Sequence, residues 1–343
     1  MTAGLWARRL LLGVGGVGAA SLALLAGLEL SLRWHPAALH AQPPGLVRSH
    51  MTRGYELVPG FVGRTNVYAV EISPQGFRGR PLAIPKPAGT LRVACLGDSF
   101  TFGLGIPEAA TYTQQLEQRL QQAMPGRPVE VLNGGVPGYD TVLEWRLLQE
   151  VVQRYEPDII LIQFAINDAE ERPVYALPVK SAWLNRGKDL LRWLYSYNFL
   201  AERYYTLAAR LNGLGHTDPQ RRVAFYQAIY AEGHPGWRAC REALASLQQF
   251  EEQTGTAIVL MLYPWLERLG PGGEYPYRQM HQTVRQAWQR EDRLIDLLDV
   301  LHGQEERTLW ASPQDHHPNG RCNALVAERI AGFLAEQPLL TGD

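Results

Sequence analysis

This chain of 343 residues has few cysteines, almost no net charge and no internal repeat. It has three cysteines, Cys95, Cys240 and Cys322, whose spacing forms neither a metal-binding motif nor a disulfide framework, although one bridge between Cys240 and Cys322 stays open. The 33 basic and 34 acidic residues leave a formal net charge of −1, without a long run of Lys or Arg. We therefore expect no nucleic-acid partner.

Charge is absent altogether from the stretch Leu10–Leu28, LLLGVGGVGAASLALLAGL. Its 19 apolar or small residues would rise about 28 Å as a helix, which matches the thickness of a bilayer core. Apolar residues continue past Glu29 to Arg33 and Trp34, a pair typical of a membrane interface. We therefore predict a transmembrane helix over residues 10–32. The alternative, a cleaved signal peptide, usually has a shorter apolar region.

The charges around this helix predict its orientation. Arg8 and Arg9 precede it, and basic residues favour the cytoplasmic side of a membrane. The bias is modest, because Arg33 and Arg48 follow on the other side. We expect a single-pass protein of the cell membrane with a cytoplasmic amino terminus and an extracytoplasmic body, which would be periplasmic in a Gram-negative cell.

The rest of the chain predicts one α/β domain over residues 89–338, preceded by a linker and irregular β segment over residues 33–88 that packs onto it. Within the domain, apolar strand-like runs alternate with helical patterns, which is typical of a parallel sheet covered on both faces. Strands are expected at Leu91–Leu96, Val129–Asn133, Asp158–Phe164, Ala257–Tyr263 and Arg293–Leu297. Helices are expected at Thr111–Ala123 (with a Thr111/Gln114 capping box), Thr141–Tyr155, Trp237–Gln253 and Asn323–Glu336.

A helical insertion over about residues 179–232 separates the third and fourth strands. Most of its aromatic residues are expected in the core or between packed helices. The others would line a substrate cleft or lie on a membrane surface, and both alternatives stay open. The aromatic residues are Trp183, Trp193, Tyr195, Tyr197, Phe199, Tyr204, Tyr205, Phe225, Tyr226 and Tyr230.

Chemically reactive groups follow the predicted strands. Ser99 follows the first strand in VACLGDSFTFG, which is not the G-x-S-x-G nucleophile elbow because a threonine replaces the second glycine. A glycine-rich turn, Asn133–Gly138, follows the second strand, and Asn167 follows the third. Asp315 and His317 lie near the carboxyl terminus. Because open α/β sheets bind ligands outside the carboxyl ends of their strands, we expect these groups to meet at one edge.

These residue types are the ones that acyl transfer needs. A serine hydroxyl is a weak nucleophile until a base takes its proton, and a histidine oriented by a carboxylate does this near neutral pH. The tetrahedral intermediate carries an oxyanion, which needs preorganised hydrogen-bond donors. The Ser99 N–H, a glycine N–H in the second turn and the Asn167 amide would supply three. The pattern predicts a serine-dependent acyl-transfer site.

The four stretches Gly97–Ser99, Asn133–Gly138, Ala165–Asp168 and Asp315–Asn319 together resemble the sequence blocks of the SGNH (GDSL-type) hydrolase family, over Leu91 to Glu336. The resemblance implies a flavodoxin-like, three-layer α/β/α sandwich around about five parallel strands, with no metal or cofactor. It implies that Ser99 is the nucleophile, His317 the base and Asp315 its acidic partner. The implied oxyanion hole consists of Ser99, Gly135 and Asn167, with Gly134 as the alternative glycine.

The chain departs from the family pattern in two places. Ala165 stands where the third block usually has a glycine, which would strain or shift Asn167 if that backbone needed a positive φ. Asp315 lies two residues before His317, where many members have three, although the shorter spacing resembles that of membrane-anchored relatives.

Neighbouring polar residues have competing interpretations. His316 is a rival base, but Pro318 directly follows His317, as in the family motif. A metal site at these histidines is disfavoured, because no second His/Cys cluster completes it. Asp98 and Asp168 are expected to hold their loops by hydrogen bonds from side chain to backbone.

These observations predict a membrane-anchored serine esterase or O-acyltransferase that acts on acyl esters, foremost acetyl esters, of cell-envelope glycan. The resemblance adds that similar anchored members take part in acetylating envelope polysaccharides. Expected partners are an acylated carbohydrate or lipid substrate, the membrane through the amino-terminal helix, and a membrane acyl-transfer protein. The alternatives are a lipase or lysophospholipase, and a non-catalytic module that binds glycan or organises a complex.

Overall fold

A five-stranded, all-parallel sheet forms the centre of the computed structural model, which describes residues 2–34, 42–65, 67–171, 181–211, 219–313 and 315–337. The strand order is β6-β5-β7-β8-β9. The predicted α/β fold is confirmed, and all five strands occur where the sequence predicted them. They are β5 (Leu91–Gly97), β6 (Val129–Gly135), β7 (Ile159–Phe164), β8 (Ala257–Leu262) and β9 (Leu294–Asp296).

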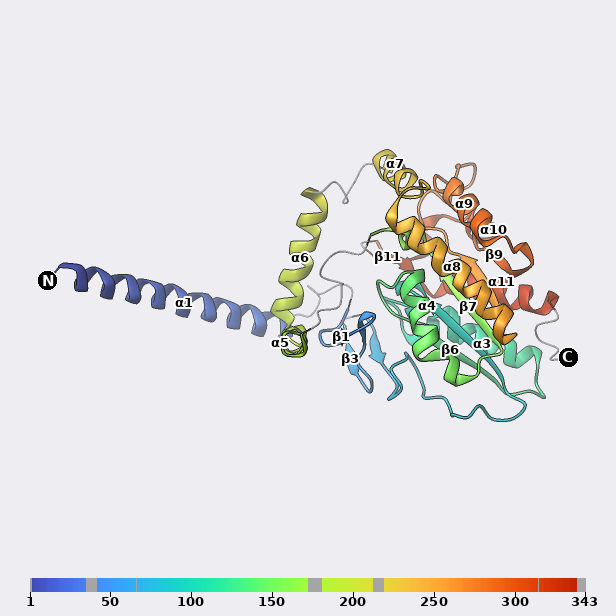
Figure 1. Ribbon diagram of the computed structural model, residues 1–343, viewed down its shortest axis with the longest axis horizontal. Coiled ribbons are helices and arrows are strands. Elements are labelled where there is room, and N and C mark those ends of the chain that lie inside the picture. Colours follow the sequence, from blue (N-terminus) through green and yellow to red (C-terminus); the bar gives the residue numbers. More distant parts are fainter. Residues whose placement is uncertain are drawn as a thin grey trace.

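Helices cover both faces of the sheet and complete the predicted three-layer sandwich (Figure 1). Helices α3 (Tyr112–Ala123) and α11 (Gly320–Glu336) pack together on one face. Helices α4 (Thr141–Glu150) and α8 (Pro235–Thr254) pack together on the other, with α9 (Arg278–Trp288) beside α8. Because both faces are covered, every residue of β5, β7 and β8 is buried, which explains their continuous apolar sequences.

Local hydrogen bonds move some helix boundaries from their predicted positions. The helix expected over Thr141–Tyr155 ends at Glu150, and a 3₁₀ turn follows over Val152–Tyr155. The closing helix begins at Gly320, because the Asn319 side chain caps it by accepting from the Cys322 N–H at 3.0 Å.

The capping box predicted for α3 is only half formed. The Thr111 hydroxyl accepts from the Gln114 N–H at 3.3 Å. The reciprocal bond is not made, because the Thr111 N–H donates to the Glu108 carbonyl and the Gln114 amide donates to Glu117.

The three cysteines lie in separate elements of the core, Cys95 in β5, Cys240 in α8 and Cys322 in α11. All three are free and buried, so the bridge between Cys240 and Cys322 that the sequence left open is not formed. Burial raises the pKa of each thiol, to about 12 for Cys322.

The segment between residues 42 and 88 packs onto the sheet domain through two small hairpins and a buried arginine. The hairpins pair β1 (Val47–His50) with β2 (Gly54–Leu57), and β3 (Val62–Arg64) with β4 (Ala69–Glu71). The arginine is Arg78, whose guanidinium donates to the carbonyls of Phe102 and Gly103 at 2.6 Å each and of Ile106 at 2.8 Å. Arg78 therefore holds the loop that follows Ser99.

Helix α1 (Thr2–Trp34) extends away from the body as a single long rod (Figure 1). Its described side chains are exposed from residue 14 to residue 27. The stretch Val14–Trp34 is long and apolar enough to cross a membrane, by length and composition, a test that a signal sequence near an amino terminus also passes.

The insertion between β7 and α8 contains α5 (Ala182–Arg192), α6 (Tyr195–Leu211) and α7 (Pro219–Ile229), while residues 172–180 and 212–218 lie outside the described part. The prediction placed most of its aromatic residues in the core or between packed helices, but no described aromatic side chain of α5 or α6 is in the core, and Tyr195 contacts α1 through Arg33. Among the described side chains only Tyr226 and Tyr230 are buried, whereas Trp183, Trp193 and Tyr204 are exposed. The side chain of Tyr205 lies outside the described residues. Helices α5 and α6 stand off the sheet domain, so their outer faces have no core to join.

We predict that Arg78→Met destabilises the fold by about 3 kcal/mol, because it leaves buried carbonyl oxygens without a donor. Urea denaturation followed by tryptophan fluorescence measures this free energy of unfolding. The control is Arg80→Met in the same segment, where an arginine half exposed to solvent pairs with Glu117 at 3.0 Å and contributes less than about 1 kcal/mol. Equal losses in the two variants would contradict the role of Arg78.

Candidate active site

Ser99 lies where β5 turns abruptly into the short helix α2 (Ser99–Phe102). The Asp98 side chain caps this helix by accepting from the Phe100 N–H at 2.8 Å, and Gly103 ends it in the left-handed conformation, with φ 80°. A methyl group on Gly97 would lie 2.1 Å from the Thr101 hydroxyl oxygen, so glycine is required where strand and helix meet. The turn places the Ser99 hydroxyl at the carboxyl edge of the sheet.

His317 connects Ser99 to Asp315 in a hydrogen-bonded series. His317 Nε2 lies 2.9 Å from Ser99 Oγ, and His317 Nδ1 lies 2.5 Å from Asp315 Oδ1. Asp315 and His317 belong to β11 (Asp315–Pro318), which pairs with β10 (Trp310–Ser312). Residues two apart on a strand face the same side, which is why the short spacing lets the carboxylate reach the imidazole.

Asp315 is held in its ionised form by its surroundings. Burial by itself raises the pKa of the carboxyl, but the hydrogen bond from His317 and the charge of that ring outweigh burial and lower the pKa below its usual value. A charged carboxylate can orient the imidazole and stabilise its protonated form.

The rival histidine, His316, faces away from Ser99. Its ring stacks on Trp310 with 3.8 Å between ring centroids and 13° between ring planes. Because side chains alternate along β11, His316 and His317 cannot both face the serine. Over the described ranges, no group of three or more His, Cys, Asp or Glu residues could hold a metal ion.

Asn167 follows β7 in a 3₁₀ turn, Ile166–Ala169, and lines a cavity beside this edge. Its side-chain oxygen is buried without a hydrogen-bond partner in the described structure. Ala165 has φ −118° and ψ 158°, an extended conformation that any residue adopts. The alanine that departs from the family pattern therefore causes no backbone strain.

The predicted oxyanion glycine, Gly135, does not have a free N–H. That N–H donates to Asn133 Oδ1 at 3.1 Å, and a methyl group on Gly135 would lie 2.1 Å from the Phe102 nitrogen. Gly134, the alternative, pairs with Leu96 within the sheet. Gly135 therefore lets β6 approach α2, Gly134 lies against β5, and the structure does not support the predicted donor role of Gly135.

Gly138 lies in the same glycine-rich turn, for which the sequence analysis named only Gly135 and Gly134. It has φ 79° and lines the cavity together with Asn167. The signal was available, because the third glycine of NGGVPG lies beyond the end of the strand, where a turn exposes backbone N–H groups.

A group of buried carboxyls lies beneath the site, at Asp98, Glu144 and Asp168. Asp98 binds backbone as predicted, whereas Asp168 Oδ2 accepts from the Thr141 hydroxyl at 2.6 Å and so ties its turn to α4. Burial raises the pKa of all three carboxyls, well above the usual value for Glu144 and Asp168, and the neighbouring carboxyls add to the rise for those two. Burial therefore disfavours the charged forms of Glu144 and Asp168.

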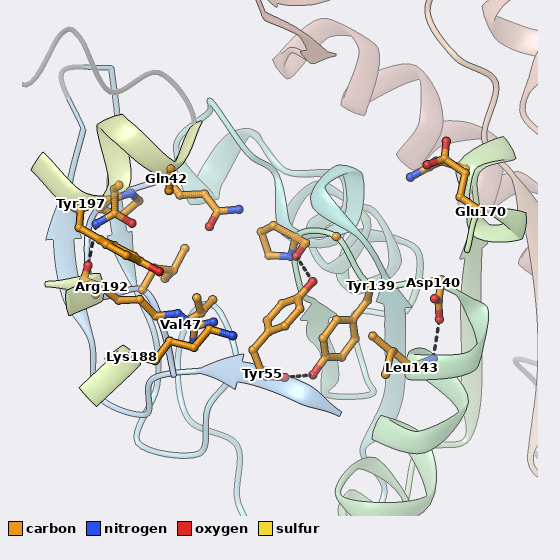
Figure 2. Close-up of a pocket in the computed structure, with 18 of the residues that line it drawn as sticks. Gln42, Val47, Tyr55, Tyr139, Asp140, Leu143, Glu170, Lys188, Arg192 and Tyr197 are labelled. Carbon is orange, nitrogen blue, oxygen red and sulfur yellow. Dashed lines mark hydrogen bonds between the residues drawn. The ribbon is translucent and has the colours of Figure 1, made fainter. Parts of the chain in front are cut away.

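A cavity of about 530 Å³ extends from Asn167 to helices α5 and α6. Figure 2 shows Glu170 and Asp140 on one side of it and Lys188, Arg192 and Tyr197 on the other. Tyr55 and Tyr139 lie between the two sides and are fixed by hydrogen bonds, from the Tyr55 hydroxyl to the Pro137 carbonyl at 2.9 Å and from the Tyr139 hydroxyl to the Tyr55 carbonyl at 2.6 Å. The volume lies in the range of small-molecule sites.

No curated protein matches this chain, but solved structures do at low identity. A two-domain esterase active on acetylated mannans is 15% identical, with a TM-score of 0.41 over 73% of this chain and 50% of that chain. An acetylxylan esterase from Geobacillus stearothermophilus is 18% identical, with a TM-score of 0.43 over 71% of this chain and 94% of that chain. A lipase from a goat rumen metagenome is 16% identical, with a TM-score of 0.44 over 71% of this chain and 97% of that chain.

A family model described as GDSL-like lipase/acylhydrolase matches residues 95–325. This range begins in β5, directly before the turn that carries Ser99, and ends in α11. It includes Asn167 and His317, the end of β5, and the whole of β6, β7, β8 and β9. Since the match extends over more than half of the 343 residues, the chain belongs to the GDSL-like lipase/acylhydrolase family, a family of ester hydrolases.

Proposed function

We propose that this protein is a membrane-anchored serine esterase or O-acyltransferase that acts on acyl esters, foremost acetyl esters, of cell-envelope glycan. Membership of the family supports ester chemistry. The observation that carries the proposal is the hydrogen-bonded series of Ser99, His317 and Asp315 at the sheet edge where Asn167 lines a cavity. A non-catalytic module would have no need to keep this series intact.

The reaction begins when Ser99 Oγ attacks the ester carbonyl carbon while His317 Nε2 takes the hydroxyl proton. The tetrahedral intermediate collapses, and the departing alcohol receives that proton from His317. The acyl group is then bound to Ser99 as an ester. Water attacks this acyl-enzyme in hydrolysis, and a sugar hydroxyl attacks it in transfer, while His317 takes a proton from the attacking oxygen. The bond to Ser99 Oγ then breaks, and His317 returns the proton to Ser99, which restores the free enzyme.

Three donors would stabilise the oxyanion of the intermediate, the Ser99 N–H, the Gly138 N–H and the Asn167 amide. Gly138 replaces Gly135 in this proposal, because the Gly135 N–H already donates to Asn133. The buried, unpartnered oxygen of Asn167 supports an orientation in which its NH₂ group faces the cavity.

The shape and lining of the cavity favour a glycan ester over a long acyl chain. Its lining mixes aromatic rings such as Tyr55 and Tyr197 with charged side chains such as Glu170 and Lys188. Aromatic faces and polar groups together suit a sugar, whereas a purely apolar channel would suit a lipid tail. Hydrolysis of short-chain but not long-chain p-nitrophenyl esters would support this choice over a lipase.

We predict that Ser99→Ala and His317→Ala each lower kcat/KM for p-nitrophenyl acetate roughly 10³–10⁶-fold, and that the double variant loses little more, because members of such a unit act together. Labelling by a fluorophosphonate should disappear in Ser99→Ala. His316→Ala is the matched control and should retain activity, since that ring stacks on Trp310. Labelling that persists in Ser99→Ala would contradict the assignment of the nucleophile.

We predict that Asn167→Ala lowers kcat about 10²–10³-fold with little change in KM, because the donor acts on charge that exists only in the transition state. Ala165→Gly should leave kcat almost unchanged, since Ala165 already has an unstrained extended backbone. Steady-state kinetics on the same ester tests both variants. A silent Asn167→Ala together with a faster Ala165→Gly would mean that Asn167 is displaced from the site.

We predict that α1 anchors the protein and that the body lies outside the cytoplasm. The chain should resist carbonate extraction from membranes, and protease added to intact spheroplasts should digest the body while a cytoplasmic marker stays intact. A body that is protected under those conditions would reverse the orientation. Release of the whole chain by carbonate would exclude the anchor itself.

A further inference from the structure

Helices α5 and α6 carry most of the exposed apolar surface outside α1. Of the thirteen large apolar side chains that are exposed in the described structure beyond α1, nine belong to residues 183–207. We call these nine the α5–α6 apolar face. They are Trp183, Leu184, Leu190, Leu191, Trp193, Leu194, Leu200, Tyr204 and Leu207.

Seven of these residues form one stripe on each helix, and Trp193 and Leu194 lie between the two helices. Leu200, Tyr204 and Leu207 follow one another at spacings of four and three, and Trp183 lies seven and eight residues before Leu190 and Leu191. Such spacings put side chains on one side of a helix. Each stripe is therefore a continuous apolar surface and not a scatter of single residues.

The opposite face of α5 is used for binding to the body. The Asp189 carboxylate accepts from the Ser49 N–H at 2.8 Å and from the Ser49 hydroxyl at 2.9 Å. The Arg192 carbonyl accepts from the Gly45 N–H at 2.9 Å. In Figure 1, β1, which contains Ser49, lies on the body side of α5. The apolar stripe of α5 lies on the side of the helix opposite Asp189, so it faces away from β1.

The amino end of α6 is fixed to the last turns of α1. The Glu29 carboxylate accepts from the Ser196 N–H and hydroxyl at 2.7 Å each and from the Tyr195 N–H at 3.2 Å. These are N–H groups that a helix start leaves without partners, so Glu29 acts as a cap supplied by another helix. Leu32 is buried, and the Arg33 guanidinium lies 5.2 Å from the centre of the Tyr195 ring.

The arrangement of the three helices matches a membrane surface. In Figure 1, α6 runs almost at right angles across the body end of α1, and α5 is seen nearly end-on, so that both cross the direction of α1. A helix α1 that passes through a bilayer would therefore hold α5 and α6 parallel to its surface. Residues 182–211 contain five basic and two acidic side chains. Lys188 and Arg192 line the cavity, whereas Arg186 and Arg203 are exposed to solvent and suit anionic headgroups.

We propose that α5 and α6 lie in the headgroup region of the membrane that α1 crosses, with the α5–α6 apolar face against the acyl-chain boundary and anionic lipids around the basic residues. The proposal rests on the membrane anchor of the proposed function. Trp and Tyr are the residues favoured at this depth, and Trp183 and Tyr204 are exposed there, whereas the Trp193 ring also contacts Phe61 of the body. The same two helices form one wall of the cavity at Asn167, so the cavity lies next to the lipid surface.

The test uses the full chain in vesicles of phosphatidylcholine and phosphatidylglycerol. Leu190→Cys on α5 and Leu207→Cys on α6 are each labelled with an environment-sensitive fluorophore, while the three natural cysteines are buried. Gln286→Cys, at an exposed position on α9, is the matched control. Both α5–α6 positions are exposed, so the labels do not disturb packing.

We expect blue-shifted emission at positions 190 and 207, and loss of most of that emission with spin-labelled lipids, but neither effect at position 286. If positions 190 and 207 behave like 286 in protein that resists carbonate extraction, the anchor holds and the inference is wrong. If the whole chain is extracted by carbonate, the anchor and the inference fail together. A third outcome is a blue shift that increases with the amount of protein per vesicle and is not quenched by spin-labelled lipid. It would mean that the α5–α6 apolar face contacts a second copy of the chain, and the inference would be wrong.

Discussion

The close approach of the Ser99 turn to the ends of β5 and β6 is the constraint on which the site depends. Gly97 and Gly135 leave no room for a methyl group, which would lie 2.1 Å from the Thr101 hydroxyl oxygen or from the Phe102 nitrogen. The turn therefore packs directly against the edge of the sheet. The Asp98 carboxylate accepts a hydrogen bond at the start of the turn, and the Arg78 guanidinium donates one at its end. A serine fixed in this way can receive His317, which lies 218 residues later in the chain.

Polar groups hold the residues of the site in place. Asp315 does so by direct contact with His317, and Asp168 does so by fixing the turn that contains Asn167. Asp315 is kept ionised by His317, so it can orient the imidazole. Burial raises the pKa of Asp168, and its side chain ties the turn that carries Asn167 to α4 through the Thr141 hydroxyl. The pKa values of two aspartates thus move in opposite directions, because Asp315 has a histidine as hydrogen-bond partner whereas Asp168 is fully buried near other carboxyls.

The insertion connects α1 to the edge of the sheet that carries Ser99. Helix α6 is capped by Glu29 of α1, and α5 is tied to β1 through Asp189. Between these helices and the sheet lies the cavity that Asn167 lines. The cavity is therefore built from both the family fold and the helices beside α1, and Asn167 is the residue that joins it to the edge of the sheet where Ser99 lies.

The sequence by itself determined the fold and the reactive series, because each depends on local pattern. Continuous apolar runs predicted buried parallel strands, and Ser99, Asn167, Asp315 and His317 follow from short motifs at strand ends. The tertiary structure alone decided which donors are free and which apolar residues are covered. The Gly135 N–H is occupied by Asn133, a contact between two residues of one turn that no spacing rule fixes. Trp183 and Tyr204 have the helical spacing of core residues, yet they are exposed, because burial depends on which surface a helix meets after the chain has folded.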